Sequence, residues 1–217
     1  MERIINKSKS FGEAEEWDIL QHTSMTPEER QEAAAELRKR AYGIERPDVR
    51  EAQREDMKAS HFSEDTQEFL RLLSEHKVKY VIVGGEAVIY YGYARLTGDV
   101  DFFYENSKQN VINLFKVLEE FWKGEIPGIS KVEELLEPEI IIQFGTPPNR
   151  IDLMNKIDAV TFQAAWLNKT TVDLEIKEQK VPVYLIGLDE LIINKEALNR
   201  YKDLEDLKYL RKAREEK

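Results

Sequence analysis

Cysteine is absent from this chain of 217 residues, and histidine occurs only three times. Without cysteine, the chain can form neither a disulfide framework nor a zinc site made of thiolates. The histidines, His22, His61 and His76, are scattered along the sequence, which disfavours a phosphohydrolase site that relies on histidine ligands. Carboxylates are therefore the main candidates for metal ligands in this chain.

Long apolar runs are lacking too. No run is long enough to span a bilayer, and the first residues, 1–7, lack the apolar core of a signal peptide. We therefore expect a soluble, cytoplasmic protein without a membrane segment. With 41% hydrophobic residues, the chain can bury one sizeable core, or one core with an appendage.

Basic residues are in deficit. The chain has 32 lysines and arginines against 42 acidic residues, which gives a formal net charge of -10 at pH 7. Phosphate binding usually needs a basic face, so a protein that coats nucleic acids in general is disfavoured. Any contact with RNA has to be local.

The chain is predicted to have two parts. Residues 1–59 are highly charged and poor in apolar side chains, and we interpret them as an N-terminal helical extension followed by a linker over 45–59. Residues 60–217 have the pattern of a globular domain. The extension must lie on something, and we favour docking onto the main domain over an arm that binds a partner.

One helix of the extension has clear end signals. Thr26 is placed as N-cap, Pro27 lies in the first turn, and Glu29 stands at the capping-box position. The helix is predicted to run over 27–42 and to stop at Gly43.

The main domain mixes strands and helices without strict alternation. Strands are expected at 79–83, 99–104, 139–144, 150–154, 171–176 and 181–185. Helices are expected at 63–76, 86–93, 107–122, 157–166, 188–199 and 202–214. This order predicts an α+β or mixed α/β fold, with helices on one face of a mixed sheet.

A glycine pair follows the first strand of the main domain, in the run Tyr80-Val-Ile-Val-Gly84-Gly85. Glycines between a strand and a helix let backbone amides approach a ligand without Cβ atoms in the way. The start of the following helix adds partial positive charge, which suits a phosphate. Taken alone this signal is weak, because many strand-to-helix turns use glycine.

Two aspartates with one residue between them follow soon after. Side chains alternate along a strand, so Asp99 and Asp101 are predicted to point to the same side, while Val100 points away. Neighbouring carboxylates repel each other and destabilise a strand. A divalent cation between them reverses that effect, and magnesium prefers such hard oxygen ligands. A solvated strand edge with two ordinary aspartates is the less favoured alternative.

Asp152 supplies a third carboxylate. It lies in the otherwise apolar strand Ile151-Asp-Leu-Met154, and a lone acid in a buried strand needs a reason. Three aspartates on adjacent strands can bind two metals roughly 3.5–4 Å apart. We expect Mg²⁺ or Mn²⁺, with one ion on nucleotide phosphates and the other beside the attacking hydroxyl.

These residues resemble a known family. The pattern Val83-Gly-Gly85, a spacer, Gly98-Asp-Val-Asp-Phe102 and a later Asp152 is similar to the hallmark of the DNA polymerase β-like nucleotidyltransferase superfamily. The resemblance spans about residues 78–206. It implies that Gly84 and Gly85 contact the triphosphate and that the three aspartates are catalytic metal ligands.

A closer resemblance is to small prokaryotic members, including abortive-infection-type toxins of toxin–antitoxin pairs. It rests on Arg95-Leu-Thr-Gly-Asp99 and on Asn194-Lys195 with the acids that follow at 203 and 206. It implies nucleotide contacts for Arg95, Thr97 and Lys195. Three alternatives stay open: Arg95 pairing with a surface acid, Lys195 as an ordinary solvated lysine, and Lys202, Asp203 and Asp206 as an intrahelical ion-pair set.

The resemblance implies transfer of an NMP from an NTP substrate to an acceptor hydroxyl on RNA, tRNA, protein or a small molecule. A toxin with a cognate antitoxin is the setting that we favour. The last helix carries several basic residues, which we interpret as a solvated face rather than an RNA guide. A non-catalytic binding or antitoxin-like partner protein is the second hypothesis, and an unrelated metal-dependent phosphohydrolase is the third.

Overall fold

The chain folds around a seven-stranded mixed β-sheet with the order β1-β4-β5-β3-β2-β7-β6. The computed structural model describes residues 1–42, 57–93 and 95–215. The strands are β1 Ile5–Ser8, β2 Tyr80–Val83, β3 Asp99–Tyr104, β4 Ile141–Phe144, β5 Arg150–Met154, β6 Thr170–Ile176 and β7 Gln179–Leu185. β3 is parallel to β5 and β2 to β7, while the other neighbours are antiparallel. This confirms the predicted fold class.

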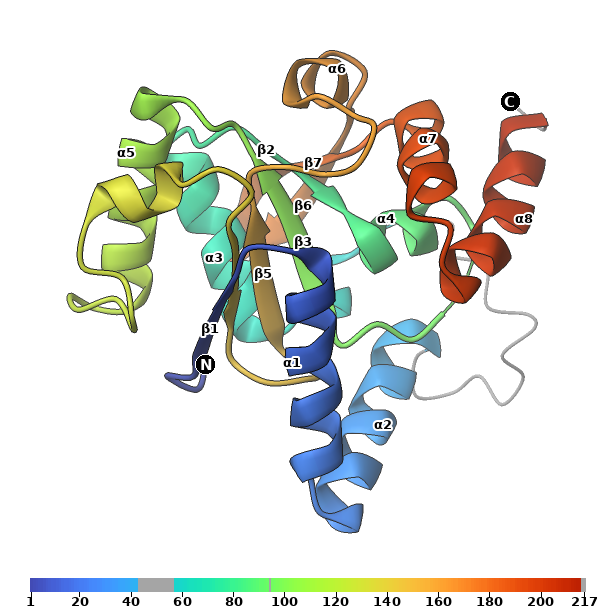
Figure 1. Ribbon diagram of the computed structural model, residues 1–217, viewed down its shortest axis with the longest axis horizontal. Coiled ribbons are helices and arrows are strands. Elements are labelled where there is room, and N and C mark those ends of the chain that lie inside the picture. Colours follow the sequence, from blue (N-terminus) through green and yellow to red (C-terminus); the bar gives the residue numbers. More distant parts are fainter. Residues whose placement is uncertain (43–56, 94, 216–217) are drawn as a thin grey trace.

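Helices cover both faces of the sheet (Figure 1). They are α1 Phe11–Ser24, α2 Pro27–Tyr42, α3 Glu64–Glu75, α4 Gly84–Tyr90, α5 Lys108–Phe121, α6 Phe162–Leu167, α7 Leu188–Leu198 and α8 Tyr201–Glu215. Short 3₁₀ turns lie at Ala59–His61 and Val132–Leu136. Across the three described stretches, no helix combines the length and apolar character needed to cross a membrane.

The expectation that helices lie on one face is wrong. Phe69 of α3 contacts Phe102 of β3, with ring centroids 5.3 Å apart. Phe162 of α6 contacts Phe103, the next residue of the same strand, at the same centroid distance. Successive strand residues point to opposite faces, so α3 and α6 lie on opposite sides of β3. β3 is therefore packed against helices on both of its faces.

Two predicted helix starts are misplaced. α4 begins at Gly84 rather than at residue 86, because Gly84 adopts a φ of 62° and takes the chain directly from β2 into the helix. α6 begins at Phe162 rather than at 157, because Thr161 caps it by accepting a hydrogen bond from the Ala164 amide. The residues before it form a small bridge between Ile157 and Val160.

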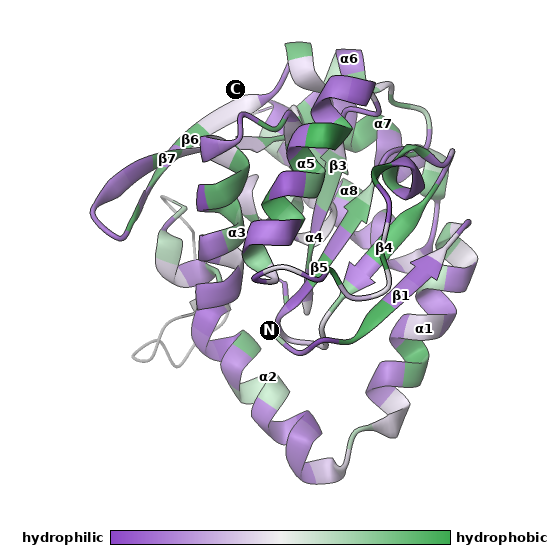
Figure 2. Ribbon diagram, turned by 90° about the vertical axis from the view of Figure 1, so that its left-hand side faces the viewer, coloured by the Kyte–Doolittle hydropathy of each residue, from purple (hydrophilic) through white to green (hydrophobic). Residues whose placement is uncertain are grey.

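The N-terminal segment contains two elements that were not predicted, β1 and α1. β1 pairs with β4 at the edge of the sheet, and α1 and α2 follow as a helical hairpin that extends away from it (Figures 1 and 2). The capping box of α2 is present, because Thr26 and Glu29 exchange hydrogen bonds of 2.7 and 3.2 Å. Gly43 and most of the predicted linker lie outside the described residues. The division near residue 59 stays a prediction, although β1 belongs to the shared sheet.

The start of α3 gives a first test of the fold. Ser63 accepts a hydrogen bond of 3.1 Å from the Thr66 amide, and α3 buries Phe69 and three leucines. Ser63→Ala should lower the free energy of unfolding by about 1 kcal/mol, because an orphan amide loses its partner. Urea unfolding measures this. Ser74→Ala, on the same helix, is the matched control and should change stability little; an equal loss there would rule out a capping effect.

Candidate functional site

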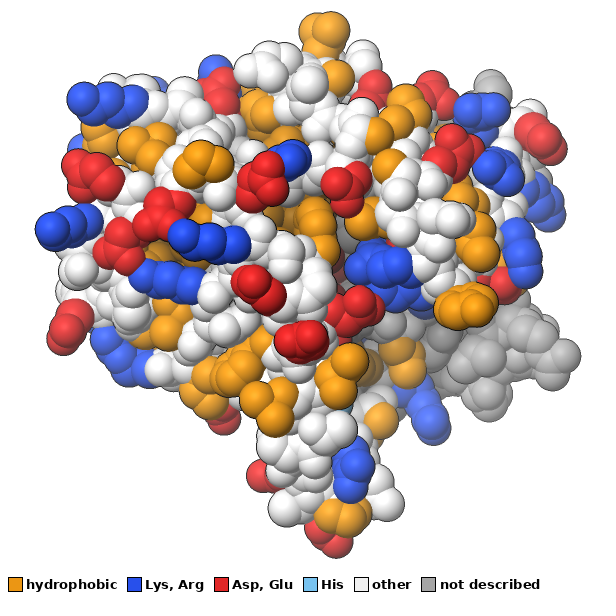
Figure 3. Space-filling model, viewed as in Figure 1, with side chains coloured by type: hydrophobic (Ala, Val, Ile, Leu, Met, Phe, Trp, Pro, Cys, Tyr) orange, Lys and Arg blue, Asp and Glu red, His pale blue; other side chains and the backbone are white. Residues whose placement is uncertain are grey.

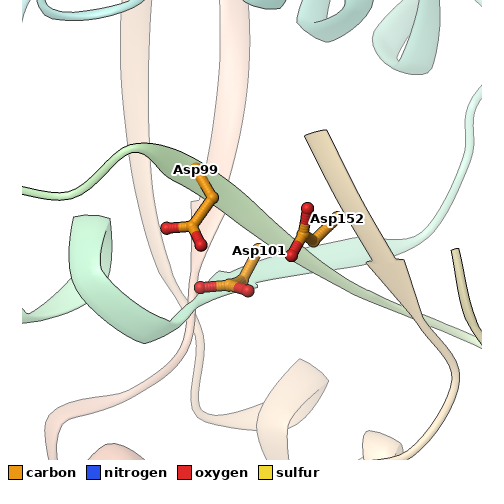
Figure 4. A group of neighbouring side chains, drawn as sticks. All are labelled: Asp99, Asp101 and Asp152. Carbon is orange, nitrogen blue, oxygen red and sulfur yellow. The ribbon is translucent and has the colours of Figure 1, made fainter. Parts of the chain in front are cut away.

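Three carboxylates converge on one side of the central strands (Figure 4). The alternation of β3 places Asp99 and Asp101 on the same side, and the parallel pairing of β3 with β5 sets Asp101 beside Asp152. One oxygen from each of the three lies within 4.8 Å of the others. We call Asp99, Asp101 and Asp152 the acidic triad. It is an all-oxygen donor set of the kind that magnesium and manganese prefer.

Burial makes the triad electrostatically unfavourable on its own. Burial raises the pKa of Asp101 far above its usual value, and the charges of Asp99 and Asp152 raise it further. Burial also raises the pKa of Asp152, although Arg150 opposes the rise. The triad thus has less positive charge around it than three ionised carboxylates require, and a divalent cation would supply that charge.

The glycine pair makes room for the triad and its neighbours. β2 pairs with β3 so that Val83 stands opposite Asp101, and the next residue, Gly84, therefore lies beside the Asp101 carboxylate. A Cβ at Gly84 would collide with Asp101 Oδ2, and a Cβ at Gly85 would collide with the Thr97 hydroxyl. The sequence predicted close backbone approach at this turn, but to a phosphate; in the structure the groups that approach are these side chains.

Arg150 is the most deeply involved of the site residues that sequence reasoning missed. Its side chain is only 3% exposed, and its guanidinium donates to Asp99 at 2.6 Å and to both oxygens of Asp152 at 2.8 and 3.1 Å. It also donates to Asp18 at 2.5 Å and to Gln21 at 3.2 Å, both on α1. The signal was present, because Arg150 and Asp152 are two residues apart on one strand and so share a face.

Two residues that precede Asp99 in the sequence, Arg95 and Thr97, donate hydrogen bonds to acids. Thr97 donates its hydroxyl hydrogen to Asp99 Oδ1 at 2.7 Å, which fixes one side of that carboxylate. Arg95 donates to both oxygens of Asp206, at 3.0 and 2.7 Å. Arg95 does pair with an acid, but Asp206 is buried and lies on α8, so the alternative of a surface acid is wrong.

Lys195 is not a solvated lysine. Its side chain is 3% exposed, and its ammonium contacts Asp203 at 2.8 Å and Asp206 at 2.9 Å. Burial alone would raise the pKa of Asp203, but hydrogen bonds from Arg200 and Lys195 lower it overall. The acids of α8, Asp203 and Asp206, therefore pair with residues outside α8, namely Lys195 of α7 and Arg95. The intrahelical set with Lys202 is wrong, because the ion partner of Lys202 is Glu15 at 3.7 Å.

These groups line one cleft. Acidic side chains of α1, Glu15 and Asp18, face the basic side chains Arg200 and Lys202 across it. The space-filling view shows the corresponding hollow between α1 and the C-terminal helices (Figure 3). The triad and the glycine pair form the floor, and Arg95 and Lys195 also line the cleft. The structure thus brings together every residue that the sequence assigned to the site except Thr97, which reaches it through Asp99.

The basic residues of α8 beyond the cleft are mostly matched by acids. Lys208 pairs with Glu205 at 2.6 Å, and Arg211 pairs with Glu196 at 2.7 Å. Arg214 lies 3.6 Å from Asp189. These exposed pairs agree with a solvated face of mixed charge.

Comparison with known proteins adds a family. Residues 61–211 match the family described as nucleotidyltransferase of unknown function (DUF6036). This segment contains the triad, the glycine pair and Lys195, and it leaves out β1, α1 and α2. No curated protein matches the chain. Among solved structures, the chain is similar to an antigenic nucleotidyltransferase-like protein from Paracoccidioides brasiliensis, with 20% identity over 69% of this chain and 77% of that one and a TM-score of 0.41.

Proposed function

The chain belongs to the family of nucleotidyltransferases of unknown function (DUF6036), and we propose that it is a metal-dependent enzyme that transfers an NMP from an NTP to an acceptor hydroxyl. The observation that carries this proposal is the convergence of three carboxylates within 4.8 Å at the floor of a cleft that has one basic wall, with Arg200 and Lys202. Three acids this close together, one buried and two half-buried, favour a bound cation, and a basic wall suits the phosphates that such a cation accompanies.

The acidic triad would hold the metal, which we propose to be Mg²⁺ or Mn²⁺ in a two-ion site. The residues fit this role because every donor is a carboxylate oxygen and because the raised pKa of Asp101 marks a deficit of positive charge. Such ions neutralise charge on the transferring phosphoryl group and lower the pKa of an attacking hydroxyl. The chain's own part is to hold three carboxylates on two rigid strands, with Thr97 and Gln143 donating to Asp99 and Asp152.

For the nucleotide, we propose contacts from Gly84, Gly85, Arg95, Thr97 and Lys195. To contact a phosphate oxygen, Arg95 and Lys195 would each have to give up part of the ion pairs that they form with the acids of α8. The cleft has a volume of about 120 Å³, whereas small-molecule sites usually begin near 300 Å³. Binding of an NTP therefore requires a wall to shift, and α1 is the wall that lies outside the family segment.

For the acceptor, we propose a hydroxyl of RNA, tRNA or protein, and a toxin paired with a cognate antitoxin as the biological setting. A non-catalytic binding protein is the competing proposal. One observation favours it: Arg150 already contacts two of the three acids, as it would in a protein that never binds a metal there.

Metal-dependent labelling separates the two. The full chain is incubated with each α-labelled NTP and with total RNA or with a cell lysate, in the presence of Mg²⁺, Mn²⁺ or EDTA. We expect covalent label on an acceptor with either metal and none with EDTA. Label on RNA or on protein identifies the acceptor class. Release of labelled nucleotide without a labelled acceptor would point to hydrolysis, and absence of turnover under every condition would leave the non-catalytic proposal.

A further inference from the structure

Arg150 contacts the oxygens that a metal in the acidic triad would need. One terminal nitrogen donates to Asp99 Oδ2 at 2.6 Å and to Asp152 Oδ2 at 3.1 Å, while Nε donates to Asp152 Oδ1 at 2.8 Å. The role proposed for the triad assigns nothing to this residue. A guanidinium and a divalent cation cannot both lie against these oxygens, so the two compete for Asp99 and Asp152.

The other half of the guanidinium belongs to α1. Its second terminal nitrogen donates to Asp18 Oδ1 at 2.5 Å and to Gln21 Oε1 at 3.2 Å. Gln21 is itself fixed, because its amide nitrogen donates to the Gly145 carbonyl at 2.9 Å. Arg150 is thus shared between the triad and a helix outside the segment that matches the family.

We propose that Arg150 is a positioning residue that takes the place of the metal when the triad is empty, and that its guanidinium stays with Asp18 and Gln21 when a metal binds Asp99 and Asp152. This inference rests on the metal site in the proposed function but not on transfer itself. Without a metal, Arg150 offsets the repulsion between the carboxylates of Asp99 and Asp152. With metal bound, α1 keeps the guanidinium from becoming an unpaired buried charge.

Removal of Arg150 and removal of the Asp18 charge should have opposite effects on metal affinity. Removal of Arg150 takes away the competitor, so metal should bind more tightly even though the empty site becomes less stable. Removal of the Asp18 charge weakens the contact between Arg150 and α1. Arg150 should then hold Asp99 and Asp152 more firmly, and metal should bind less tightly. A residue with a purely structural role would lower affinity, or leave it unchanged, when it is removed.

Titration of the full chain with Mn²⁺ alone, with free Mn²⁺ followed by electron paramagnetic resonance, tests both signs. We expect Arg150→Met to bind Mn²⁺ at least about 10-fold more tightly than the parent, and Asp18→Asn to bind on the order of 10-fold more weakly, the scale of outer-shell effects on metal sites. Metal-free Arg150→Met should melt at a lower temperature than the parent, and Mn²⁺ should raise its melting temperature by more.

Two further variants make the result specific. Glu16→Gln removes the same charge from an exposed position of α1 and should leave affinity unchanged. In the Arg150→Met background, Asp18→Asn should no longer weaken binding, because its effect acts through Arg150. If Arg150→Met does not fold, Arg150→Lys replaces it and should also bind more tightly than the parent, because it loses the two-pronged contact with Asp152.

Equal or weaker binding by the Arg150 variant, or an Asp18 effect of the same size with and without Arg150, overturns the proposal. Failure of nucleotidyl transfer does not bear on it, because no nucleotide is present in the titration. Conversely, the labelling experiment can succeed while this proposal fails.

Discussion

Asp101→Asn is expected to abolish nucleotidyl transfer and, at the same time, to stabilise the metal-free protein. Asp101 is a donor of the acidic triad, and the loss of its charge should lower the rate by more than the roughly 10- to 100-fold that an outer-shell partner is worth. In the empty site the same carboxylate is unfavourable, because burial and two neighbouring acids raise its pKa. Asparagine keeps the shape without the charge, and we expect a gain of about 1 kcal/mol.

The gain in stability should increase with pH. The pKa of Asp101 in the folded protein lies above its ordinary value of 3.8, so the folded state binds this proton more tightly than the unfolded state does. The free energy of unfolding of the parent therefore falls as pH rises from the ordinary pKa to the raised one. The asparagine variant lacks that fall. Urea unfolding in EDTA at several pH values measures the difference between the two proteins.

Magnesium should reverse the order of stability. A ligand that binds only the folded state adds about 2.7 kcal/mol at 100 times its Kd, and the parent has this gain whereas Asp101→Asn has little of it. Asp173→Asn is the matched control, because Asp173 is exposed on β6, far along the sheet. A less stable Asp101→Asn protein in EDTA would contradict the electrostatic argument, and full transfer activity would remove Asp101 from the site.

Gly84→Ala is expected to remove activity and to lower stability together. Gly84 has a φ of 62°, where a side chain is strained, and its Cβ would collide with Asp101 Oδ2. The strain costs about 1–3 kcal/mol, and the collision moves a carboxylate of the triad. A displacement of 1 Å at a reacting centre can cost about 100-fold in rate. The labelling assay and urea unfolding measure the two effects.

Gly92→Ala separates strain from collision. Gly92 also has a positive φ, 105°, but a Cβ there would meet no atom within 4 Å. It should lose stability and keep activity, whereas Gly84→Ala should lose both. The effect of Gly84→Ala on stability should also shrink in an Asp101→Ala background. Equal activity of the two glycine variants would show that the turn does not constrain the triad.

The central part of the fold could be predicted from the sequence because its signals are local. The strand 150–154 is found with the predicted bounds, and Ser63, Thr26 and Glu29 mark helix starts through hydrogen bonds to residues three positions away. The alternation of side chains sufficed to put Asp99 and Asp101 on one face. Pairing between distant strands, such as Asp101 with Asp152, was an inference from chemistry rather than from pattern.

β1 and α1 were missed because their contacts are non-local. β1 has only four residues, which is too short for a clear alternation of side chains, and it pairs with a single strand. α1 buries only Ala14 and Gln21 and leaves Ile19 and Leu20 exposed, which gives no apolar stripe. The role of Arg150 depends on α1, and its partners Asp18 and Gln21 are more than 120 residues away in sequence. No local pattern predicts that contact.

The two walls of the cleft differ in the sign of their charge. On the side of the sheet and α1, the acids among the described lining residues outnumber the cations, of which Arg150 is the example there. On the side of α7 and α8, Arg95, Lys195 and Arg200 outnumber the two acids that they share. We therefore expect an electric field directed across the cleft. For the proposed substrate, a metal–nucleotide complex, we expect this field to favour one orientation, with the cations toward the acids and the phosphate oxygens toward the basic wall.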